Sequence, residues 1–305
     1  MINSLIAARD IHFVTTVIVA GIVFFDLYIA APVLRSELRL PATEASFRGL
    51  AAKLLIVSLA VSVASAIAWL WLLAARIADK PFDEVVADGT VWIVLWQTQF
   101  GLTWAVRLLF AAALTLSLLL QWNTKAVGVW HRVLAALLAS AYLGSLALAG
   151  HGGEGLGFEK NIHLAADMLH LLAAGTWLGG LIPFAILLTY MRRLREPSWD
   201  TAARNTAGRF STLGLFAVGI LLVSGIINTT FLVGGLQGLT GTTYGQWLLI
   251  KIGLFIPMFC LATINRQYLL PRLCGSSGAD QSVLTVQRLV LSTFFEIALG
   301  LAIIG

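Results

Sequence analysis

The sequence is poor in charged residues. Only 11% of its 305 residues are Asp, Glu, Lys or Arg, whereas ordinary soluble domains carry roughly 25%. Hydrophobic residues make up 59% of the chain. They occur in runs long enough to cross about 30 Å of hydrocarbon, which takes about 20 helical residues. This pattern excludes a soluble globular protein, because water would be the wrong solvent for most of its surface.

Sulfur ligands are also scarce. The two cysteines, Cys260 and Cys274, form no CxxC motif, which excludes a disulfide framework and a thiolate metal site. The four methionines form no cluster, so a thioether path for a soft metal ion is not expected. A GxxxxGK[ST] motif is absent as well, and this excludes a P-loop ATPase.

The hydrophobic runs predict an all-α bundle of about eight transmembrane helices. A β-barrel is excluded, because it would require strands of alternating polarity. Without a long linker or an internal repeat, residues 1–305 are expected to form a single transmembrane domain. The predicted spans are residues 11–33, 50–74, 102–120, 129–149, 162–189, 210–233, 247–270 and 286–304.

The basic residues predict the orientation of the bundle. Most of them lie in the segments that follow the odd-numbered spans, and the opposite segments hold only Arg9, Arg76, Lys80, Arg107 and Lys160. Under the positive-inside rule, the basic segments face the cytoplasm and both termini face the periplasm. Topology therefore explains the net charge of +5, and nucleic acid is not expected as a partner.

Three polar residues of the fifth span predict a metal site. His163, Asp167 and His170 follow one another at spacings of four and three, which places them on one helical stripe. Such groups are costly inside a membrane unless they bind a ligand, bind one another or line water. Imidazole and carboxylate suit several divalent ions, of which copper generally binds tightest. A structural hydrogen-bond network is the alternative interpretation.

Two further histidines are candidate ligands. His151 lies in a glycine-rich segment just before the fifth span, and glycines let the backbone fold back over the stripe. His12, at the outer end of the first span, could join if the first and fifth spans are neighbours. By contrast, His131 begins the fourth span on the inner side and is expected to be an interfacial residue.

Three charged residues lie within the apolar spans. An unpaired charge there costs at least ~2.5 kcal/mol on insertion scales. Lys251 and Glu296 are therefore predicted to interact directly or through water. Together with Asp26, they are candidate groups of a proton or ion path.

The outer segment between the second and third spans combines aromatic and acidic residues. Trp92, Trp96 and Trp104 are expected to lie in an interfacial aromatic belt. The acids of residues 79–88 form a candidate docking surface. In the fifth span, Gly179 and Pro183 predict an interruption of the helix.

At these residues the sequence resembles the copper resistance D family (CopD/PcoD type), whose members are bacterial inner-membrane proteins associated with copper uptake or handling. The resemblance runs along most of the chain. It rests on Arg9-x2-His12-Phe13, Ala149-Gly150-His151, His163-Leu164-x2-Asp167-x2-His170-Leu171-x5-Trp177-Leu178-Gly179-Gly180-Leu181, Ser224-Gly225-x2-Asn228, Thr243-Tyr244-Gly245-x5-Lys251, Asn265-Arg266 and Arg288 followed by Glu296.

The resemblance implies a multi-pass inner-membrane protein that receives copper from the periplasm, often from a CopC-like copper-binding protein. No β-rich CopC-like module is expected within residues 1–305, so such a partner would be a separate protein. The function predicted is copper import through His151, His163, Asp167 and His170, driven by a gradient.

Two other functions stay open at this point. The first is electron transfer, because histidines near the ends of membrane helices also hold haem in electron-transfer proteins. In a variant of this hypothesis, the site reduces copper at the periplasmic face. Haem is usually held by histidines on facing helices, whereas two of these histidines share one helix. The third possibility is a membrane scaffold without metal. A transporter or metal-binding protein is favoured over an enzyme.

Overall fold

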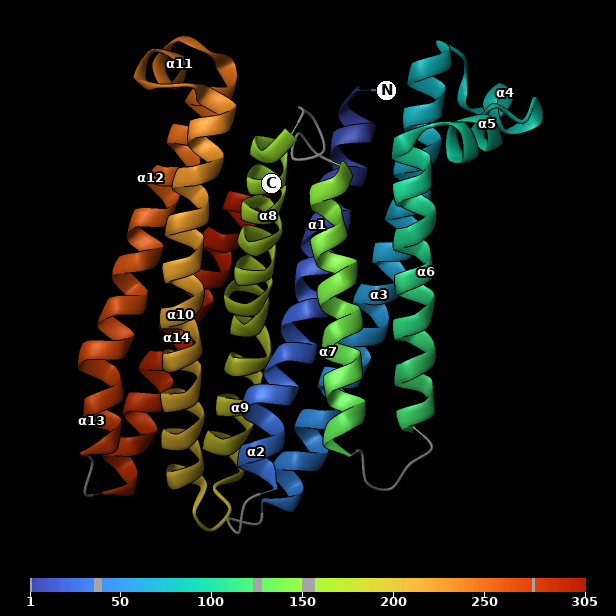
Figure 1. The fold of residues 1–305 in the computed structure, drawn as a ribbon. Helices are drawn as coiled ribbons and strands as arrows, with labels where there is room; N and C mark the ends of the chain where they lie inside the picture. Colours follow the sequence, from blue (N-terminus) through green and yellow to red (C-terminus); the bar gives the residue numbers. More distant parts are fainter. Residues whose placement is uncertain (1, 36–39, 123–127, 150–156, 276–277) are drawn as a thin grey trace.

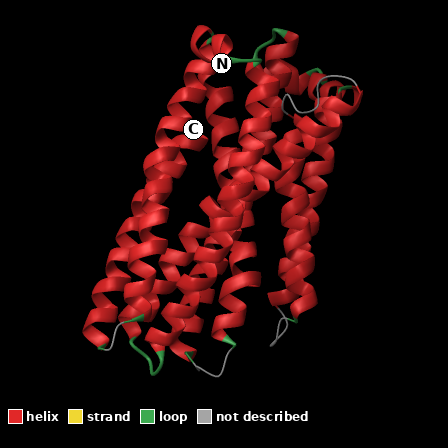
Figure 2. Cartoon of the chain, turned by 60° about the vertical axis from the view of Figure 1, so that its left-hand side comes forward, coloured by secondary structure: helices red, strands yellow, loops and turns green. Residues whose placement is uncertain are grey.

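The computed structural model describes residues 2–35, 40–122, 128–149, 157–275 and 278–305. Within these ranges the chain forms helices and short connections, with no β-strand. The long helices run up and down in one bundle, and both chain termini lie toward the same end of it (Figure 1). A view turned by 60° shows the same helical bundle (Figure 2). The predicted all-α class is confirmed.

The elements, in chain order, are α1 (Ile2–Phe25), a π-helical segment (Asp26–Ala30), α2 (Ala31–Leu34), α3 (Pro41–Ala78), α4 (Phe82–Ala87), α5 (Thr90–Gln97), α6 (Gln99–Trp122), α7 (Val129–Gly144), a 3-10 segment (Ser145–Ala149), α8 (Gly157–Ala174), a second π-helical segment (Gly175–Gly179), α9 (Gly180–Leu194), α10 (Trp199–Val233), α11 (Leu236–Gly241), α12 (Thr243–Ile264), a third π-helical segment (Asn265–Leu269), α13 (Leu270–Cys274) and α14 (Ala279–Ile304).

Eight helical stretches of the described chain are long and apolar enough to cross a membrane. They are Asn3–Leu34, Pro41–Ala78, Gln99–Leu120, Val129–Ala149, Phe158–Leu194, Trp199–Val233, Thr243–Cys274 and Asp280–Ile304. Each contains or coincides with one predicted span. The helices extend past the apolar runs because polar turns can continue a helix beyond the hydrocarbon.

Helix α1 lies at the centre of the bundle. It packs against α3, α7, α9 and the second π-helical segment. In the span that contains α1, 72% of the most apolar stretch is buried inside the protein. The corresponding share is 6% in the span that contains α12 and α13. Other helices that pack against each other are α8 with α10, α6 with α7, and α14 with α9 and α12. Polar residues of one helix therefore meet those of another along a few defined seams.

Each π-helical segment is followed by a proline. Pro32, Pro183 and Pro271 come two to four residues after the three segments. Proline has no N–H and cannot donate to the carbonyl four residues earlier, and a single π turn changes the hydrogen-bond register locally. The interruption predicted near Gly179 and Pro183 lies where the second segment ends.

The outer segment contains two short helices, α4 and α5. Trp92 and Trp96 are 60% and 58% exposed, in agreement with an interfacial position. The prediction is wrong for Trp104, which is fully buried. Its ring stacks on Phe100 with centroids 4.5 Å apart, and its indole N–H donates to the Ala66 carbonyl at 2.7 Å. Packing against α3 decides its position.

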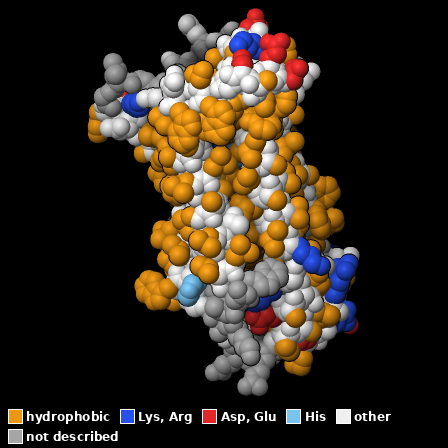
Figure 3. Space-filling model, turned by 90° about the vertical axis from the view of Figure 1, so that its right-hand side faces the viewer, with side chains coloured by type: hydrophobic (Ala, Val, Ile, Leu, Met, Phe, Trp, Pro, Cys, Tyr) orange, Lys and Arg blue, Asp and Glu red, His pale blue; other side chains and the backbone are white. Residues whose placement is uncertain are grey.

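On one face of the bundle, the exposed charged residues lie toward its two ends (Figure 3). A space-filling view shows hydrophobic side chains over the middle of one face and charged side chains toward its ends (Figure 3). The last turn of α9 carries Arg192 and Arg193, whereas the first turn of α4, at the opposite end, carries Asp83 and Glu84. This distribution fits a protein whose middle lies in hydrocarbon.

The crossing of α1 with the second π-helical segment brings two glycines into close backbone contact. A Cβ at Gly21 would collide with the backbone of Gly179, and a Cβ at Gly179 would collide with the Val17 carbonyl and the Gly21 backbone. Small residues allow membrane helices to approach closely, which increases van der Waals packing. The central helix therefore depends on Gly21 and Gly179 for its position.

We expect Gly21→Ala to lower the stability of the detergent-purified protein by about 1–3 kcal/mol, because the added methyl group overpacks this crossing. The measurement is thermal unfolding. Gly219→Ala is the matched control, since a Cβ at Gly219 meets nothing within 4 Å. Equal unfolding temperatures for the two variants would contradict the proposed role of the crossing.

Candidate metal site

The predicted stripe of α8 faces α10. His163 is 7% exposed, and its ring stacks on Phe231 with centroids 5.1 Å apart. His170 Nδ1 lies 3.0 Å from Ser224 Oγ. Because α8 and α10 pack together along their lengths, the imidazoles lie in the seam between the two helices and are shielded from lipid.

Ser224 contacts one of the two ring nitrogens of His170. Ser224 Oγ donates to the Ile220 carbonyl at 2.6 Å, so its oxygen accepts from the Nδ1–H of His170. In the tautomer that follows, Nδ1 carries the proton and Nε2 carries the lone pair. A metal-binding imidazole is commonly oriented by a hydrogen bond from its other ring nitrogen, as Nδ1 makes here. At Gly225, a Cβ would lie 3.5 Å from the His170 ring. The seam thus holds the ring in a defined orientation.

Asp167 lies between the two histidines and meets a polar residue of α10. Asn228 Nδ2 donates to Asp167 Oδ1 at 3.5 Å. The amide oxygen of Asn228 is buried and has no hydrogen-bond partner in the described structure. Tyr244, near the start of α12, interacts electrostatically with Asp167. The carboxylate therefore lies in a polar part of the seam that retains an unused acceptor.

The α8 donors are not gathered into a finished cage. Among the residues that the structure describes, no three His, Cys, Asp or Glu side chains are grouped closely enough to hold a metal ion. His163 and His170 are seven residues apart, about 10.5 Å along the helix axis, and each contacts α10 separately. His151 lies outside the described residues. Imidazole and carboxylate are donor types that suit copper, but the structure does not bring His163 and His170 together at one ion.

The partners on α10 were not assigned a role from the sequence. Ser224, Asn228 and Phe231 repeat the spacing of the stripe, four and then three residues apart. This spacing places them on one face of α10. The pattern was visible in the sequence, but only the packing of α10 on α8 shows which stripe it meets.

His12 lies in a different polar cluster. Its Nδ1 is 2.8 Å from the Ser62 carbonyl, and its Nε2 is 2.6 Å from Arg107 Nη2. A guanidinium group has only donors, so Nε2 must accept and Nδ1 must donate. Both ring nitrogens are thereby engaged, and the structure does not place His12 with the stripe.

Arg107 is a buried cation that sequence analysis treated only as a marker of topology. It is 1% exposed. Its Nη1 donates to the Tyr142 carbonyl at 3.1 Å and to Ser145 Oγ at 2.8 Å. The guanidinium also lies over the rings of Trp104 and Tyr142, at 5.2 Å and 5.1 Å. The sequence feature that could have predicted its burial is the position of Arg107 within an otherwise apolar run.

Glu296 lines a cavity in the other half of the bundle. The side chain is 2% exposed and accepts a hydrogen bond from Asn265 Nδ2 at 2.6 Å. Both residues border a cavity of about 460 Å³ among α9, α10, α12, α13 and α14. The amide oxygen of Asn265 is buried without a hydrogen-bond partner in the described structure.

The seam that holds the histidines continues to this cavity. Trp177 lies seven residues after His170, in the second π-helical segment, and it lines the cavity. A Cβ at Gly214 of α10 would lie 3.6 Å from the Trp177 ring. The histidine stripe and Glu296 are therefore connected by one continuous helix interface.

Lys251 and Glu296 are not brought into direct contact. Lys251 interacts electrostatically with Arg9 and Asp10 of α1, whereas Glu296 is bonded to Asn265. Lys251 precedes Asn265 by 14 residues, about 21 Å along a helix. An interaction of Lys251 with Glu296 through water stays a prediction.

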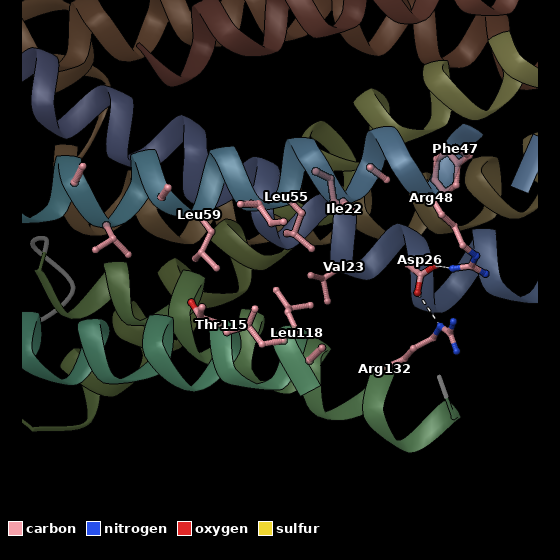
Figure 4. A pocket seen from close by; sticks show the side chains of 18 of the residues that line it. Ile22, Val23, Asp26, Phe47, Arg48, Leu55, Leu59, Thr115, Leu118 and Arg132 are labelled. Atoms are coloured by element: carbon pink, nitrogen blue, oxygen red, sulfur yellow. Dashed lines mark hydrogen bonds and ion pairs between the residues drawn. The ribbon is translucent and has the colours of Figure 1, made fainter. Parts of the chain in front are cut away.

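Asp26 lies in the first π-helical segment, at a second cavity. Its carboxylate oxygens are 2.7 Å from Arg132 Nε and 3.3 Å from Arg48 Nη1, as Figure 4 shows. The structure thus gives Asp26 two cationic partners at the basic end of the bundle. Its predicted role in an ion path stays a prediction.

Two family descriptions match the sequence. "Copper resistance protein D-like, N-terminal domain" matches residues 1–160, and "Copper resistance protein D" matches residues 204–305. No solved structure matches the chain.

Three curated proteins are similar to the chain. Copper resistance protein D of Pseudomonas syringae pv. tomato is 28% identical over 98% of this chain and 93% of its own length. Inner membrane protein YebZ of Escherichia coli (strain K12) is 29% identical over 88% of this chain and 85% of its own length. Copper transport protein CutJ of Bacillus subtilis (strain 168) is 31% identical over 68% of this chain, but the match spans 37% of that protein.

These similarities agree with the bundle of eight apolar spans in the described chain, and together they indicate a multi-pass protein of the inner membrane. The chain belongs to the copper resistance protein D family.

Proposed function

We propose that the protein takes up copper at the periplasmic face of the inner membrane and moves it toward the cytoplasm. His163, Asp167 and His170 form the entry site, and His151 is a further ligand. The observation that carries this proposal is the stripe of two imidazoles and a carboxylate, directed into the seam between α8 and α10. Membership of a family named for copper resistance supports copper as the substrate.

The donor set supports binding of copper as an ion. His170 offers Nε2 because Ser224 occupies Nδ1, and Asp167 is either a direct ligand or the acceptor that orients an imidazole. The facing residues of α10 are Ser224, Asn228 and Phe231, and α10 contains no histidine. A haem held by histidines of these two helices is therefore not supported.

A separate CopC-like protein is the proposed copper donor. Asp83 and Glu84 are exposed on α4, within the acidic segment of residues 79–88. Asp88 is held by Lys80, whose ammonium donates to it at 2.5 Å. This hydrogen bond, with those from Thr90, lowers the pKa of Asp88. The exposed carboxylates of α4 are thus the better candidates for contact with a partner.

The inward route is proposed to follow the seam from His170 past Trp177 to the cavity at Glu296. Polar groups within a membrane commonly mark ion pathways, and two of the π-helical segments contribute residues to this cavity. π turns are frequent at functional sites. Glu296 is the proposed proton or ion-exchanging group of the route.

We expect His163→Ala and His170→Ala to weaken equilibrium copper binding by more than about 100-fold. If Asp167 only orients an imidazole, Asp167→Asn should cost about 10 to 100-fold; if it is a ligand, its loss should match that of a histidine. Binding is measured on the detergent-purified protein. The matched control is His131→Ala, an exposed histidine at the opposite end of the bundle. Unchanged stoichiometry and affinity in the His163→Ala, His170→Ala double variant would refute the site.

Copper affinity is expected to fall as the pH is lowered through about 6.5, the ordinary pKa of histidine. Imidazole must be neutral to coordinate, so protons compete with the metal. Titrations at about pH 7.5 and about pH 5.5 test this expectation. Equal affinity at both values would indicate that the imidazoles do not bind the ion.

The basic segments are expected to face the cytoplasm, which places both termini in the periplasm. The structure supports this proposal by placing both termini toward the end opposite Arg192 and Arg193. Reporter fusions after Gly305 measure the location directly. An active cytoplasmic reporter there would place the histidine stripe toward the cytoplasm and remove it as a periplasmic entry site.

Glu296→Gln should leave copper binding intact but slow copper uptake into sealed proteoliposomes by about tenfold, equivalent to about 1.4 kcal/mol on the barrier. The substitution keeps the shape of the side chain but removes its ionisable group. Glu159→Gln, at an exposed acid near the start of α8, is the control. Uptake at the wild-type rate in Glu296→Gln would exclude Glu296 from the route without affecting the binding site.

A further inference from the structure

A second cavity lies between α3 and α6, with α1 and α7 forming its base (Figure 4). Its volume is about 800 Å³, and its lining residues on α3 run from Phe47 to Ile67. This stretch covers about 30 Å at 1.5 Å per residue, the thickness of the hydrocarbon core. Ile56 and Leu119, at its rim, are 50% and 58% exposed. The cavity is therefore a long groove that borders the lipid.

The groove is charged only toward one end (Figure 4). Among the described residues of the lining, Thr115 is the one uncharged polar residue, and the charged residues are Asp26, Arg48 and Arg132. The rest of the lining consists of aliphatic residues and Phe47, with alanines along α3 that leave space for an occupant. A ligand that matches this lining has a long apolar part and a charged group at one end.

The charged end carries an excess of positive charge. Arg48 contacts both Asp26 and Glu44, at 3.3 Å and 2.7 Å, and Arg132 contacts Asp26 at 2.7 Å. Arg35 lies nearby: desolvation, and then the charges of Arg132 and Arg48, lower its pKa. Three guanidinium groups thus face two carboxylates among the described residues. The side chain of Arg48 is 34% exposed, so its guanidinium is accessible from the groove.

We propose that this groove binds an anionic phospholipid, with an acyl chain along α3 and α6 and the phosphate at Arg48. Basic pockets between transmembrane helices are known to bind anionic headgroups, and each Lys or Arg near the membrane surface contributes about 1 kcal/mol to such attraction. The apolar length and the net positive end match the two parts of this ligand.

The size of the groove favours a lipid over a transmembrane helix of a partner. A helix about 10 Å wide and 30 Å long occupies roughly 2,400 Å³, more than the cavity holds. A helix could therefore only lie across the opening, where it would not reach the base formed by α1 and α7. A flexible acyl chain can fill a narrow groove of this length.

Native mass spectrometry of the detergent-purified protein tests the proposal with two probes, dioleoyl phosphatidylglycerol and dioleoyl phosphatidylcholine. Their acyl chains are identical, so a difference in retention reports the headgroup. We expect the wild type to retain phosphatidylglycerol preferentially. Arg48→Gln should weaken phosphatidylglycerol binding by about fivefold, the loss of about 1 kcal/mol, whereas Arg48→Lys should keep the preference.

Two variants separate this site from general charge effects. Arg272→Gln removes the same charge at an exposed position of α13, at the same end of the bundle, and should leave the preference unchanged. Ala60→Phe places a ring in the groove and should reduce retention of both lipids. If Arg48→Gln does not fold, Ala60→Phe alone tests whether the groove binds lipid. Equal retention of the two lipids by the wild type, or wild-type retention in Ala60→Phe, would overturn the proposal.

Discussion

Within a lipid bilayer no water is available to a buried polar group, so each such group must find its partner within the protein. This constraint organises the polar residues of the chain into seams between helices. His170 meets Ser224 across α8 and α10, Glu296 of α14 meets Asn265 of the third π-helical segment, and Asp26 of the first π-helical segment meets Arg132 of α7. The remaining surface is free to be apolar.

The π-helical segments place residues at these seams. Asp26 begins the first segment, Trp177 lies in the second, and Asn265 begins the third. Each segment precedes a proline, which removes one backbone donor and makes an interruption of the regular helix favourable at that point. The same sequence feature that interrupts the helix therefore also orients a side chain toward a cavity. The close contact of Gly21 with Gly179 then fixes the second segment against the central helix.

The histidines fall into different classes because their neighbours differ. His12 is enclosed by Ser62 and the buried guanidinium of Arg107, which uses the lone pair that a metal would need. His170 is paired with neutral groups, the Ser224 hydroxyl and the Leu221 carbonyl, which orient the ring without a competing cation. A cation as neighbour thus makes one imidazole structural, whereas a neutral neighbour leaves the other suited to a ligand.

The sequence alone determined the number and type of the helices, because the length of an apolar run is set by the thickness of the hydrocarbon. It also placed His163, Asp167 and His170 on one face, since helical periodicity depends on local spacing. Tertiary structure decided which helix that face meets, and it separated His12 from the stripe and Lys251 from Glu296. Spacing along one helix carries no information about neighbouring helices. Their identity follows from side-chain packing between residues far apart in the chain, such as Gly21 with Gly179 and Ser224 with His170.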